Sequence, residues 1–482
     1  KVRLNLSIIT NIMKKIILFR LLLAGILFGL WYICYPHTIQ HLEETAFYAN
    51  IPDYFYKYHS LPTDFIKIIG NYIAQFYQYH WVGAILQTIF VLFVLAACDI
   101  IFYRLLGNRK WLWISFIPSY IFAIQQTEKV GIEFSITWVI IIWILAIISL
   151  LIRKVPIITH IPQTDNKYLL KICEYSVPII CILLVIHNLL YNPNRLYFEK
   201  MQRIEHAAVN HQWDVILKEI PNDIQPIREV QFRYFLLALS EKELLGEYLF
   251  HFPIRNEKDF LFDTQGSVPY RFNSLFYWNL GLPNEAIRFA FQENQAGVSG
   301  DMTFAATRRL VDWYMQKGDI RQAKFYLNIL SHSTCHKKFI RTRNIFLQQT
   351  TQPDIPHRVF FINAKLSVTA LYLLELDCTD QRALNYLLCC LLLEKELDSF
   401  YSMFRTYWSE EKAIPTHYAE ALLMLSDKYP EILSHYDISR QKQTEYKEYS
   451  ELLQKGSSGL QTINMKYRNT FWRYMLFNQQ NY

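Results

Sequence analysis

Two adjacent acids, Glu43 and Glu44, stand in the segment HLEETAF, shortly after a long apolar run. A carboxylate just outside a membrane can act as a general base toward an acceptor, or it can bind a divalent ion beside a lipid phosphate. We therefore take Glu43 and Glu44 as the candidate catalytic residues. The competing interpretation is a solvated rim beside a helix that lies on the membrane surface.

The placement of this acid pair resembles that in membrane glycosyltransferases that use polyprenyl-linked sugars. Such enzymes carry an acid in the first external loop, and several have helical repeats at their carboxyl end. The segment HLEETAF departs from their paired-Asp motif, and they generally have more membrane spans than this sequence predicts. The resemblance implies a sugar transferase as the alternative function.

Other catalytic and metal-binding signatures are absent from the sequence. It contains no phosphate-binding glycine loop, Gly-x-Ser-x-Gly elbow, His-Glu-x-x-His pair or Cys-x-x-Cys pair. In HSTCH, His332, Cys335 and His336 fall at i, i+3 and i+4, but no fourth ligand is near, so we interpret this segment as a turn. Adjacent Cys389 and Cys390 are predicted to be small apolar residues of a buried helix. We predict no metal ion and no cofactor.

The composition indicates a chain of two unlike parts. Its 482 residues are 52% hydrophobic and carry a formal net charge of +7. The first 171 residues hold 15 Lys and Arg against 8 Asp and Glu, whereas the remainder holds 34 of each. A neutral second part gives no electrostatic footprint for nucleic acid, so we exclude that class of partner.

Apolar runs predict a membrane domain over residues 1–191. A helix needs about 20 residues to cross about 30 Å of hydrocarbon. Five segments meet or approach that length: 16–36, 82–103, 110–126, 132–152 and 169–190. The third is short and contains Pro118, so a re-entrant hairpin is its alternative. Asp99, within the second segment, is predicted to pair with Arg104 or with a neighbouring helix.

Residues 37–81 then form an external loop. Apolar side chains recur there at helical spacing, which predicts an amphipathic helix in the headgroup region. The stripe consists of Phe65, Ile69, Tyr72, Ile73 and Phe76.

The distribution of basic residues predicts the orientation. Twelve Lys and Arg fall on the side of the amino terminus, and only Lys57, Lys67 and Lys129 fall on the other side. Positive charge gathers on the cytoplasmic side of inner-membrane proteins. We therefore expect a bacterial inner-membrane protein with a cytoplasmic amino terminus and a periplasmic domain after Tyr191. A start-like Met13 leaves open whether residues 1–12 belong to the native chain.

Residues 192–482 show helical periodicity and an internal repeat. Gly281 and Gly318, like Ala286 and Ala323, are separated by 37 residues, close to the repeats that stack paired helices into solenoids. The expected fold class is therefore all-α: a polytopic membrane domain followed by a TPR-like α-solenoid.

Two longer irregular stretches interrupt the helical pattern of this second part. The stretches 251–272 and 348–365 are predicted to be functional loops. The segment 454–462 is predicted to be a hinge before the last helix.

Three segments resemble an uncharacterised family of multi-pass membrane proteins found in gut Bacteroidota. They are DYFYKYHSLPTDFIKIIGNYIAQFYQYHWVGAIL (53–86), YNPNRLYFEK (191–200) and KYRNTFWRYMLF (466–477). The resemblance implies an inner-membrane location and a periplasmic helical domain, and it implies no activity. In place of that family's acid motif, Gln-Glu-Gln-like, this chain has HLEETAF.

The leading functional hypothesis is a membrane-anchored binding or assembly protein of unknown ligand. The lipid bilayer is one partner, and the helical repeats would hold a protein or glycan partner. The lipid-linked sugar transferase is the alternative, and a transporter component ranks third because few charges are buried in the predicted spans.

Overall fold

The computed structural model describes residues 2–58, 61–107, 109–128, 131–151, 167–220, 229–296, 302–349, 365–409 and 411–477. Every regular element in these ranges is a helix, which confirms the predicted all-α class. Arg153, Lys154 and most of the predicted loop 348–365 lie outside the described residues.

The chain forms two compact units. The first combines Lys1–Arg203 with Gly297–Asp354, and the second combines Ile204–Ala296 with Ile355–Tyr482. This division differs from the sequence-based boundary between 191 and 192. A segment from the predicted second part packs with the membrane-domain residues instead.

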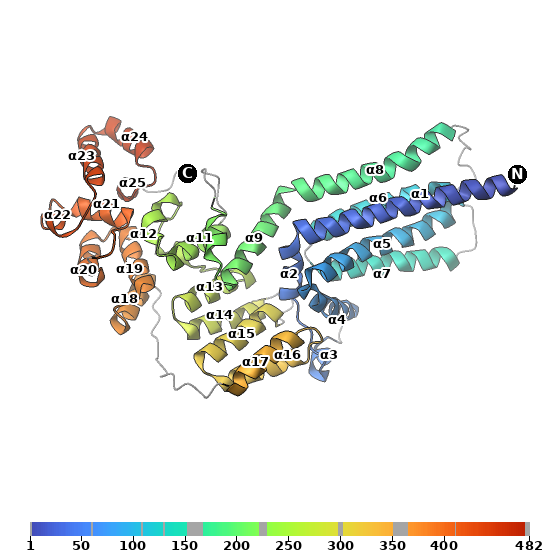
Figure 1. Cartoon of the computed structure of the whole chain (residues 1–482), viewed down its shortest axis with the longest axis horizontal. Coiled ribbons are helices and arrows are strands. Elements are labelled where there is room, and N and C mark those ends of the chain that lie inside the picture. The colour runs from blue at the N-terminus through green and yellow to red at the C-terminus, as the bar shows by residue number, and fades with distance from the viewer. Residues whose placement is uncertain are drawn as a thin grey trace. The chain divides into compact units, whose positions relative to one another are not determined.

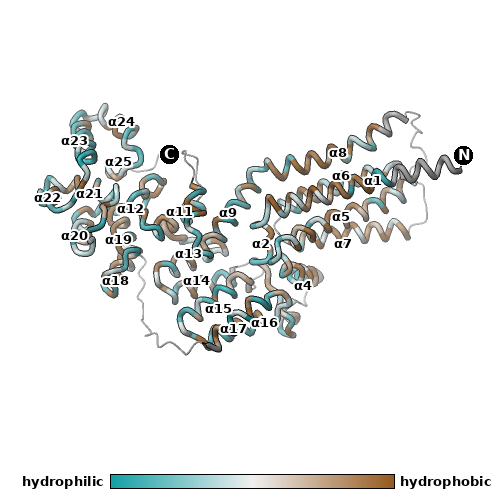
Figure 2. Tube along the Cα trace, in the orientation of Figure 1, coloured by the Kyte–Doolittle hydropathy of each residue, from teal (hydrophilic) through white to brown (hydrophobic). Residues whose placement is uncertain are grey.

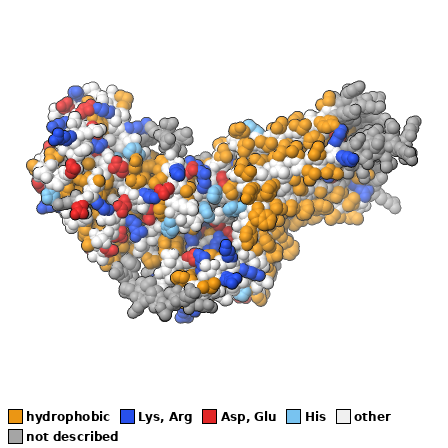
Figure 3. Space-filling view, in the orientation of Figure 1, with side chains coloured by type: hydrophobic (Ala, Val, Ile, Leu, Met, Phe, Trp, Pro, Cys, Tyr) orange, Lys and Arg blue, Asp and Glu red, His pale blue; other side chains and the backbone are white. Residues whose placement is uncertain are grey.

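The first unit contains a bundle of long apolar helices that lie side by side (Figure 1). Its members are α1 (Val2–Gly29), α5 (His80–Leu106), α6 (Phe116–Glu128), α7 (Ile132–Leu151) and α8 (Lys167–Tyr191). Among the described residues, four stretches are long and apolar enough to cross a membrane: Lys14–Cys34, His80–Leu106, Ile132–Leu151 and Ile172–Tyr191. Brown segments follow these helices in Figure 2, and Figure 3 shows hydrophobic side chains over the visible face of the bundle.

The other predicted span, 110–126, is built differently from its neighbours. It consists of the 3₁₀ helix η3 (Arg109–Ser115) followed by α6, whose third residue is Pro118. Proline is tolerated in the first turn of a helix, where the backbone N–H has no partner to lose. With rises of about 2.0 and 1.5 Å per residue, the two pieces together extend over roughly 33 Å. They pack against α5 and α8 inside the bundle.

Polar side chains of neighbouring helices pair with each other within the described part of the bundle. Arg20 on α1 forms an ion pair with Asp99 on α5, which also accepts a hydrogen bond from Ser115. Asp99 therefore pairs with a neighbouring helix, one of the two predicted options. Gln126 on α6 donates to the side chain and the backbone carbonyl of Gln87 on α5. Such pairs satisfy groups that lipid cannot.

In the described part of residues 36–79, three short helices and one 3₁₀ turn lead to α5. These are α2 (Pro36–Glu44), α3 (Pro52–Lys57), α4 (Pro62–Ala74) and η2 (Gln75–Gln78). α4 is the predicted amphipathic helix. Its Phe65 and Tyr72 remain exposed, whereas Gly70 faces the side chain of Glu133 on α7.

Helical hairpins occur in both units. α13 (Ser267–Asn279) pairs with α14 (Pro283–Ala296) in the second unit, and α15 (Phe304–Lys317) pairs with α16 (Ile320–Ser331) in the first. The turn glycines Gly281 and Gly318 have φ of +83° and +82°, a backbone region that glycine enters without steric cost. Ala286 and Ala323 are fully buried where the paired helices meet. The predicted turns and close contacts are thus present in each hairpin.

The remaining helices complete both units. α17 (Lys337–Gln349) follows α16, and α9 (Pro193–Val209) contains the boundary between the units. The second unit also holds α10 (Trp213–Leu217), α11 (Glu229–Glu241), α12 (Leu245–Tyr248), η4 (Leu249–His251), η5 (Glu257–Phe260), α18 (Leu366–Leu376), α19 (Gln381–Leu393), α20 (Leu397–Tyr407), α21 (Thr416–Leu425), α22 (Ile432–His435), α23 (Arg440–Gln454), α24 (Ser457–Lys466) and α25 (Phe471–Leu476).

Two local predictions can be checked within these helices. Cys389 and Cys390 lie buried in α19, as predicted. The predicted hinge 454–462 is only a short break at Gly456, with φ of +66°, because residues 457–462 belong to α24.

Candidate functional site

The position of α2 decides the environment of the predicted acids. α1 ends in a short π-helix, η1 (Leu30–Cys34), and Pro36 begins α2 at its first position. Proline cannot continue the preceding helix because it lacks an N–H and clashes with the previous turn. The carboxylate of Glu199 on α9 accepts from the backbone N–H groups of His37 and Thr38, at 2.9 and 2.8 Å. It therefore caps the first turn of α2.

Glu43 lies on the buried face of α2, one turn after Ile39. Only 2% of the side chain is exposed. Arg308 on α15 donates to both carboxylate oxygens, through Nη1 at 2.6 Å and Nη2 at 3.0 Å. His336 Nε2 lies 2.7 Å from Oε1, and Ser333 Oγ lies 2.8 Å from Nδ1 of the same imidazole. Because a carboxylate only accepts, Nε2 carries the hydrogen of that bond.

This cluster holds Glu43 in its ionised form. Burial alone would raise the pKa of Glu43, but the charge of Arg308 and the hydrogen bonds from His336 and Arg308 outweigh that effect and lower it. A carboxylate that is already deprotonated and occupied at both oxygens is poorly suited to take a proton from a substrate. The geometry therefore favours a structural role for Glu43, which ties α2 to α15 and to the turn before α17.

Glu44, the second predicted acid, is less enclosed than Glu43, although its charge also acts on Arg308. It is partly exposed and accepts a hydrogen bond from Gln40 Nε2 at 2.8 Å, one turn earlier in α2. The structure does not bring Glu43 and Glu44 together around one open space. Consecutive residues of a helix project about 100° apart, and this is the physical reason.

The segment HSTCH forms the turn between α16 and α17, not a helix face. Its backbone is joined to the 37–81 segment: Asn50 N–H donates to His332 O at 2.9 Å, and Gln78 Nε2 donates to Cys335 O at 2.8 Å. His336 binds Glu43. Among the residues that the structure describes, no three His, Cys, Asp or Glu side chains gather as a metal site would require.

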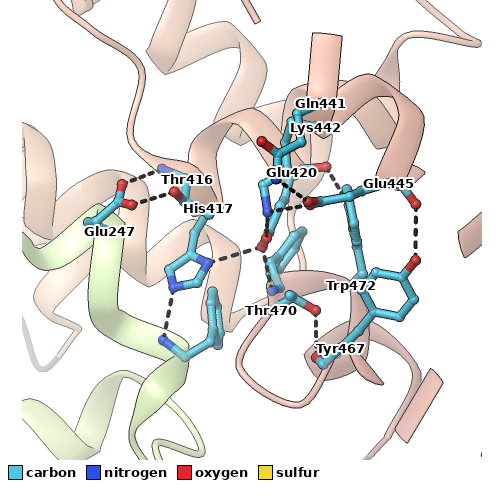
Figure 4. Close-up of polar contacts among 12 residues, drawn as sticks. Glu247, Thr416, His417, Glu420, Gln441, Lys442, Glu445, Tyr467, Thr470 and Trp472 are labelled. Atoms are coloured by element: carbon cyan, nitrogen blue, oxygen red, sulfur yellow. Dashed lines mark hydrogen bonds and ion pairs between the residues drawn. The ribbon is translucent and has the colours of Figure 1, made fainter. Parts of the chain in front are cut away.

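A second buried carboxylate, Glu420 on α21, organises part of the second unit (Figure 4). Its oxygens lie 3.0 Å from His417 Nδ1 and 3.0 Å from Lys442 Nζ, and one accepts from Phe471 N–H at 2.8 Å. Phe250 N–H points at His417 Nε2 from 3.4 Å, so the imidazole hydrogen sits on Nδ1 and faces Glu420. Burial would raise the pKa of Glu420, but His417 and Lys442 lower it. Both oxygens of Glu420 are therefore occupied by groups of the protein itself, as those of Glu43 are.

Another cluster of buried charges in the second unit is also satisfied by side chains of the protein itself. Arg271 on α13 binds Glu205 Oε2 at 2.8 Å and Glu293 Oε1 at 2.9 Å. All three side chains are buried, and they join α9, α13 and α14.

A cavity of about 280 Å³ lies within the first unit, where α1, α6 and α8 end. Its lining residues are Trp31, Tyr35, Thr38, Thr127, Glu128, Asn192, Asn194, Arg195 and Phe198. Glu199 positions one wall: because it caps α2, Arg195, one turn earlier on α9, comes to lie beside the ends of α1 and α6.

Arg195 is the least satisfied buried charge among the described residues of this region. Its side chain is 6% exposed, and Nη2 donates to Ile124 O at 2.8 Å and approaches Glu128 Oε1 at 3.5 Å. Nε and Nη1 have no hydrogen-bond partner within the described chain, nor has Trp31 Nε1. Burial lowers the pKa of Arg195, partly offset by Glu128.

Sequence reasoning missed Arg195, although one local signal was available. The residue stands in the first turn of α9, directly after the last apolar run. A cation there opposes the helix dipole, so its presence needs another reason.

Comparison with known proteins gives one family match. The profile described as "Family of unknown function (DUF6057)" matches residues 12–162 and again residues 132–478. No curated protein matches the chain, and no solved structure matches it. The match therefore shows the family of the chain and indicates no activity.

Proposed function

The chain belongs to the DUF6057 family of unknown function, and on that premise we propose that it is a membrane-anchored binding or assembly protein. The observation that carries the proposal is the pairing of helices outside the apolar bundle, in α13–α14, α15–α16 and α18–α19. Paired helices of this kind present extended surfaces to partners. A TPR-like stacking of the pairs and a protein or glycan partner are parts of this proposal.

The buried carboxylates support binding over catalysis. Glu43 and Glu420 are each occupied by cationic and amide donors of the protein itself. Groups used in this way stabilise a fold and leave little capacity for a substrate.

One surface of the first unit is suited to an acidic partner segment. A groove of about 440 Å³ runs along α16 and α17, lined in part by Lys337, Arg341 and Ile345. The exposed side chains of Ile345 and Phe346 add apolar area beside these charges. Basic groups around an apolar centre favour partners that carry carboxylates or phosphates beside apolar groups.

The test uses the tagged full chain in its native host. We expect affinity purification from a detergent extract to return the same partner in repeated experiments, and the double variant Lys337→Glu, Arg341→Glu to lose it. Charge reversal at a complementary interface costs binding because like charges then meet. Recovery of the partner must also be seen with the tag placed on the partner.

Lys324→Glu is the matched control, because Lys324 is exposed on α16 and does not line the groove. Equal recovery with the double variant and the control would remove the groove from the proposal. Repeated purification without any partner would remove the binding function itself.

The proposed location is the bacterial inner membrane, with five crossings, a cytoplasmic amino terminus and a periplasmic domain after the last span. The excess of Lys and Arg on one side of the apolar segments supports this orientation. A reporter enzyme that is active only outside the cytoplasm, fused after Tyr482, should be active. An inactive but intact fusion would reverse the topology. A Bacteroidota source is part of the same proposal.

The alternative function, a transferase for polyprenyl-linked sugars, requires an acid that can reach a substrate. Glu44 meets that condition better than Glu43, because Glu44 is partly exposed. Replacing each with Gln and comparing the glycans of the native host tests the idea. Loss of a glycan with Glu44→Gln, with protein levels unchanged, would favour the enzyme over the binding protein.

A further inference from the structure

We propose that the cavity beside Arg195 binds the headgroup of a zwitterionic aminophospholipid, with the phosphate on Arg195 and the ammonium group beside Glu128. This site goes beyond the binding function proposed above and does not depend on it. The argument rests on the level of the cavity, its unused donors, its paired charges and its size.

The cavity lies where the apolar segments end. The candidate span of α1 ends at Cys34, between the lining residues Trp31 and Tyr35, and that of α8 ends at Tyr191, next to Asn192. Headgroups meet protein at the ends of apolar spans, where aromatic side chains gather. Leu190 and Tyr191 are exposed on α8 just before the cavity, where acyl chains would pass.

Arg195 supplies unused donors for a phosphate. Leaving a buried donor without a partner costs about 1–3 kcal/mol, more when the group is charged. Nε and Nη1 of Arg195 and Nε1 of Trp31 are all in this condition among the described residues, and both side chains line the cavity. The planar guanidinium presents neighbouring N–H groups that match two oxygens of a phosphate. A phosphate oxygen in the cavity would satisfy these donors.

Glu128 selects among phosphates. Its carboxylate lies 3.5 Å from Arg195 Nη2, at the limit of a hydrogen bond, and 53% of its side chain is exposed. A bare anion on Arg195 would be repelled by this carboxylate. A headgroup that carries an ammonium two carbons from its phosphate would instead pair with it. The aromatic side chains of Trp31 and Phe198, which also line the cavity, suit the same cation.

The size of the cavity fits a headgroup. Its 280 Å³ corresponds to roughly nine waters at about 30 Å³ each. Pockets for whole drug-sized ligands measure about 300–1,000 Å³, so this cavity suits a smaller group. A phosphoethanolamine group fits inside, while the two acyl chains stay along the apolar face of the bundle.

The test measures binding of short-chain lipids to the full-length protein purified in detergent. Dihexanoyl phosphatidylethanolamine, phosphatidylcholine, phosphatidylglycerol and inorganic phosphate are titrated separately, and binding is followed by calorimetry. We expect phosphatidylethanolamine to bind most tightly, because only its primary ammonium donates hydrogen bonds to Glu128. Phosphatidylglycerol and free phosphate lack the cation and should bind more weakly.

Variants separate the two halves of the site. Arg195→Met should weaken binding of phosphatidylethanolamine at least about ten-fold, in line with the loss of charge-assisted hydrogen bonds. Arg195→Lys keeps the charge but lacks the planar pair of N–H groups, so its affinity for phosphatidylethanolamine should lie between those of the wild type and Arg195→Met. Glu128→Gln should weaken the binding of phosphatidylethanolamine and strengthen the binding of phosphatidylglycerol, so that the lipid preference is reversed. Arg321→Met is the matched control, because Arg321 is exposed on α16 and does not line the cavity.

Each outcome decides the proposal. Equal binding of all three lipids, or unchanged binding in Arg195→Met with native helicity by circular dichroism, overturns it. Tight binding of free phosphate and phosphatidylglycerol, unaffected by Glu128→Gln, overturns the zwitterionic part and assigns the cavity to a bare anion. Reversed preference in Glu128→Gln with unchanged binding in Arg321→Met confirms it.

Discussion

Glu43 and Arg195 are two buried charged side chains of the first unit, and they differ in how their hydrogen-bonding atoms are used. Both oxygens of Glu43 are occupied, by Arg308 and His336. Arg195 uses Nη2 and leaves Nε and Nη1 without partners in the described chain. The sequence draws attention to Glu43, whereas the hydrogen-bond donors without partners belong to Arg195.

The difference teaches that burial alone does not mark a site. A buried charge closed by its own chain contributes to one fixed arrangement of helices. A buried charge with unused donors beside a cavity can instead form its missing hydrogen bonds with a ligand, and these bonds would favour binding. Glu420 in the second unit follows Glu43 in this respect.

The largest expected effect comes from opening the Glu43 cluster. Glu43→Ala should lower the free energy of unfolding by about 3–5 kcal/mol, because Arg308 and His336 lose their acceptor in a buried place. Denaturant unfolding in detergent, followed by tryptophan fluorescence, measures this loss. Asp53→Ala is the control, because Asp53 is exposed on α3, and it should stay within about 0.5 kcal/mol of the wild type. Similar small changes in both variants would show that Glu43 is not a structural clamp.

Glu420→Gln should have the next largest effect, about 2–3 kcal/mol, since hydrogen bonds to the charged carboxylate become weaker neutral ones. The same unfolding experiment applies, with the fluorescence of Trp472 as a local probe because its Nε1 donates to Glu420 O at 3.0 Å. Glu445→Gln removes a more exposed carboxylate that binds the same Lys442, and should cost less than about 1 kcal/mol. A larger loss at Glu445 would contradict this ranking.

The loss of folding stability at low pH should depend on Glu43. Its pKa in the folded protein lies below the ordinary value of 4.5, so its contribution is present above that value and is lost as the pH falls through the folded pKa. Wild type and Glu43→Gln should therefore differ most near neutral pH and converge in acid. The groups that face the carboxylate are Arg308 and His336. A difference that stays constant from pH 7 to strong acid would contradict the assignment.

The smallest effect is expected at Arg195 when no lipid is present. In lipid-free detergent, Arg195→Met should leave stability unchanged or raise it by up to about 1 kcal/mol, because it removes a buried charge with unmade hydrogen bonds. Added phosphatidylethanolamine should raise the melting temperature of the wild type and not of the variant. A loss of several kcal/mol without lipid would mean that Arg195 is saturated like Glu43.

Local features of the fold were predictable because their causes lie within a few residues. The apolar runs predicted five spans, and four of them coincide with described stretches that are long and apolar enough to cross a membrane. Gly281 and Gly318 form the turns of two hairpins at positive φ. Cys389 and Cys390 lie in a buried helix as their apolar neighbours indicate. The segment 110–126 was less predictable, since a 3₁₀ start and Pro118 divide it into two pieces.

The candidate sites were predictable only in part. The sequence singled out Glu43 but was interpreted as placing it at an accessible rim, whereas the side chain is buried; its spacing of one turn from Ile39 on α2 is the signal that could have shown this. Its partner Arg308 is 265 residues away in the chain, and no local pattern joins the two. Arg195 carried only the signal of a cation in the first turn of a helix.

By itself the sequence determined an all-helical protein with apolar segments of spanning length and tight glycine turns, because hydrophobic periodicity and backbone freedom act over short distances. Only the tertiary structure decided that residues 302–349 pack with the 37–81 segment, that Glu43 is enclosed, and that Arg195 borders a cavity with donors to spare. Whether a buried charge is satisfied depends on atoms contributed by distant segments, and their arrival is a property of the folded chain.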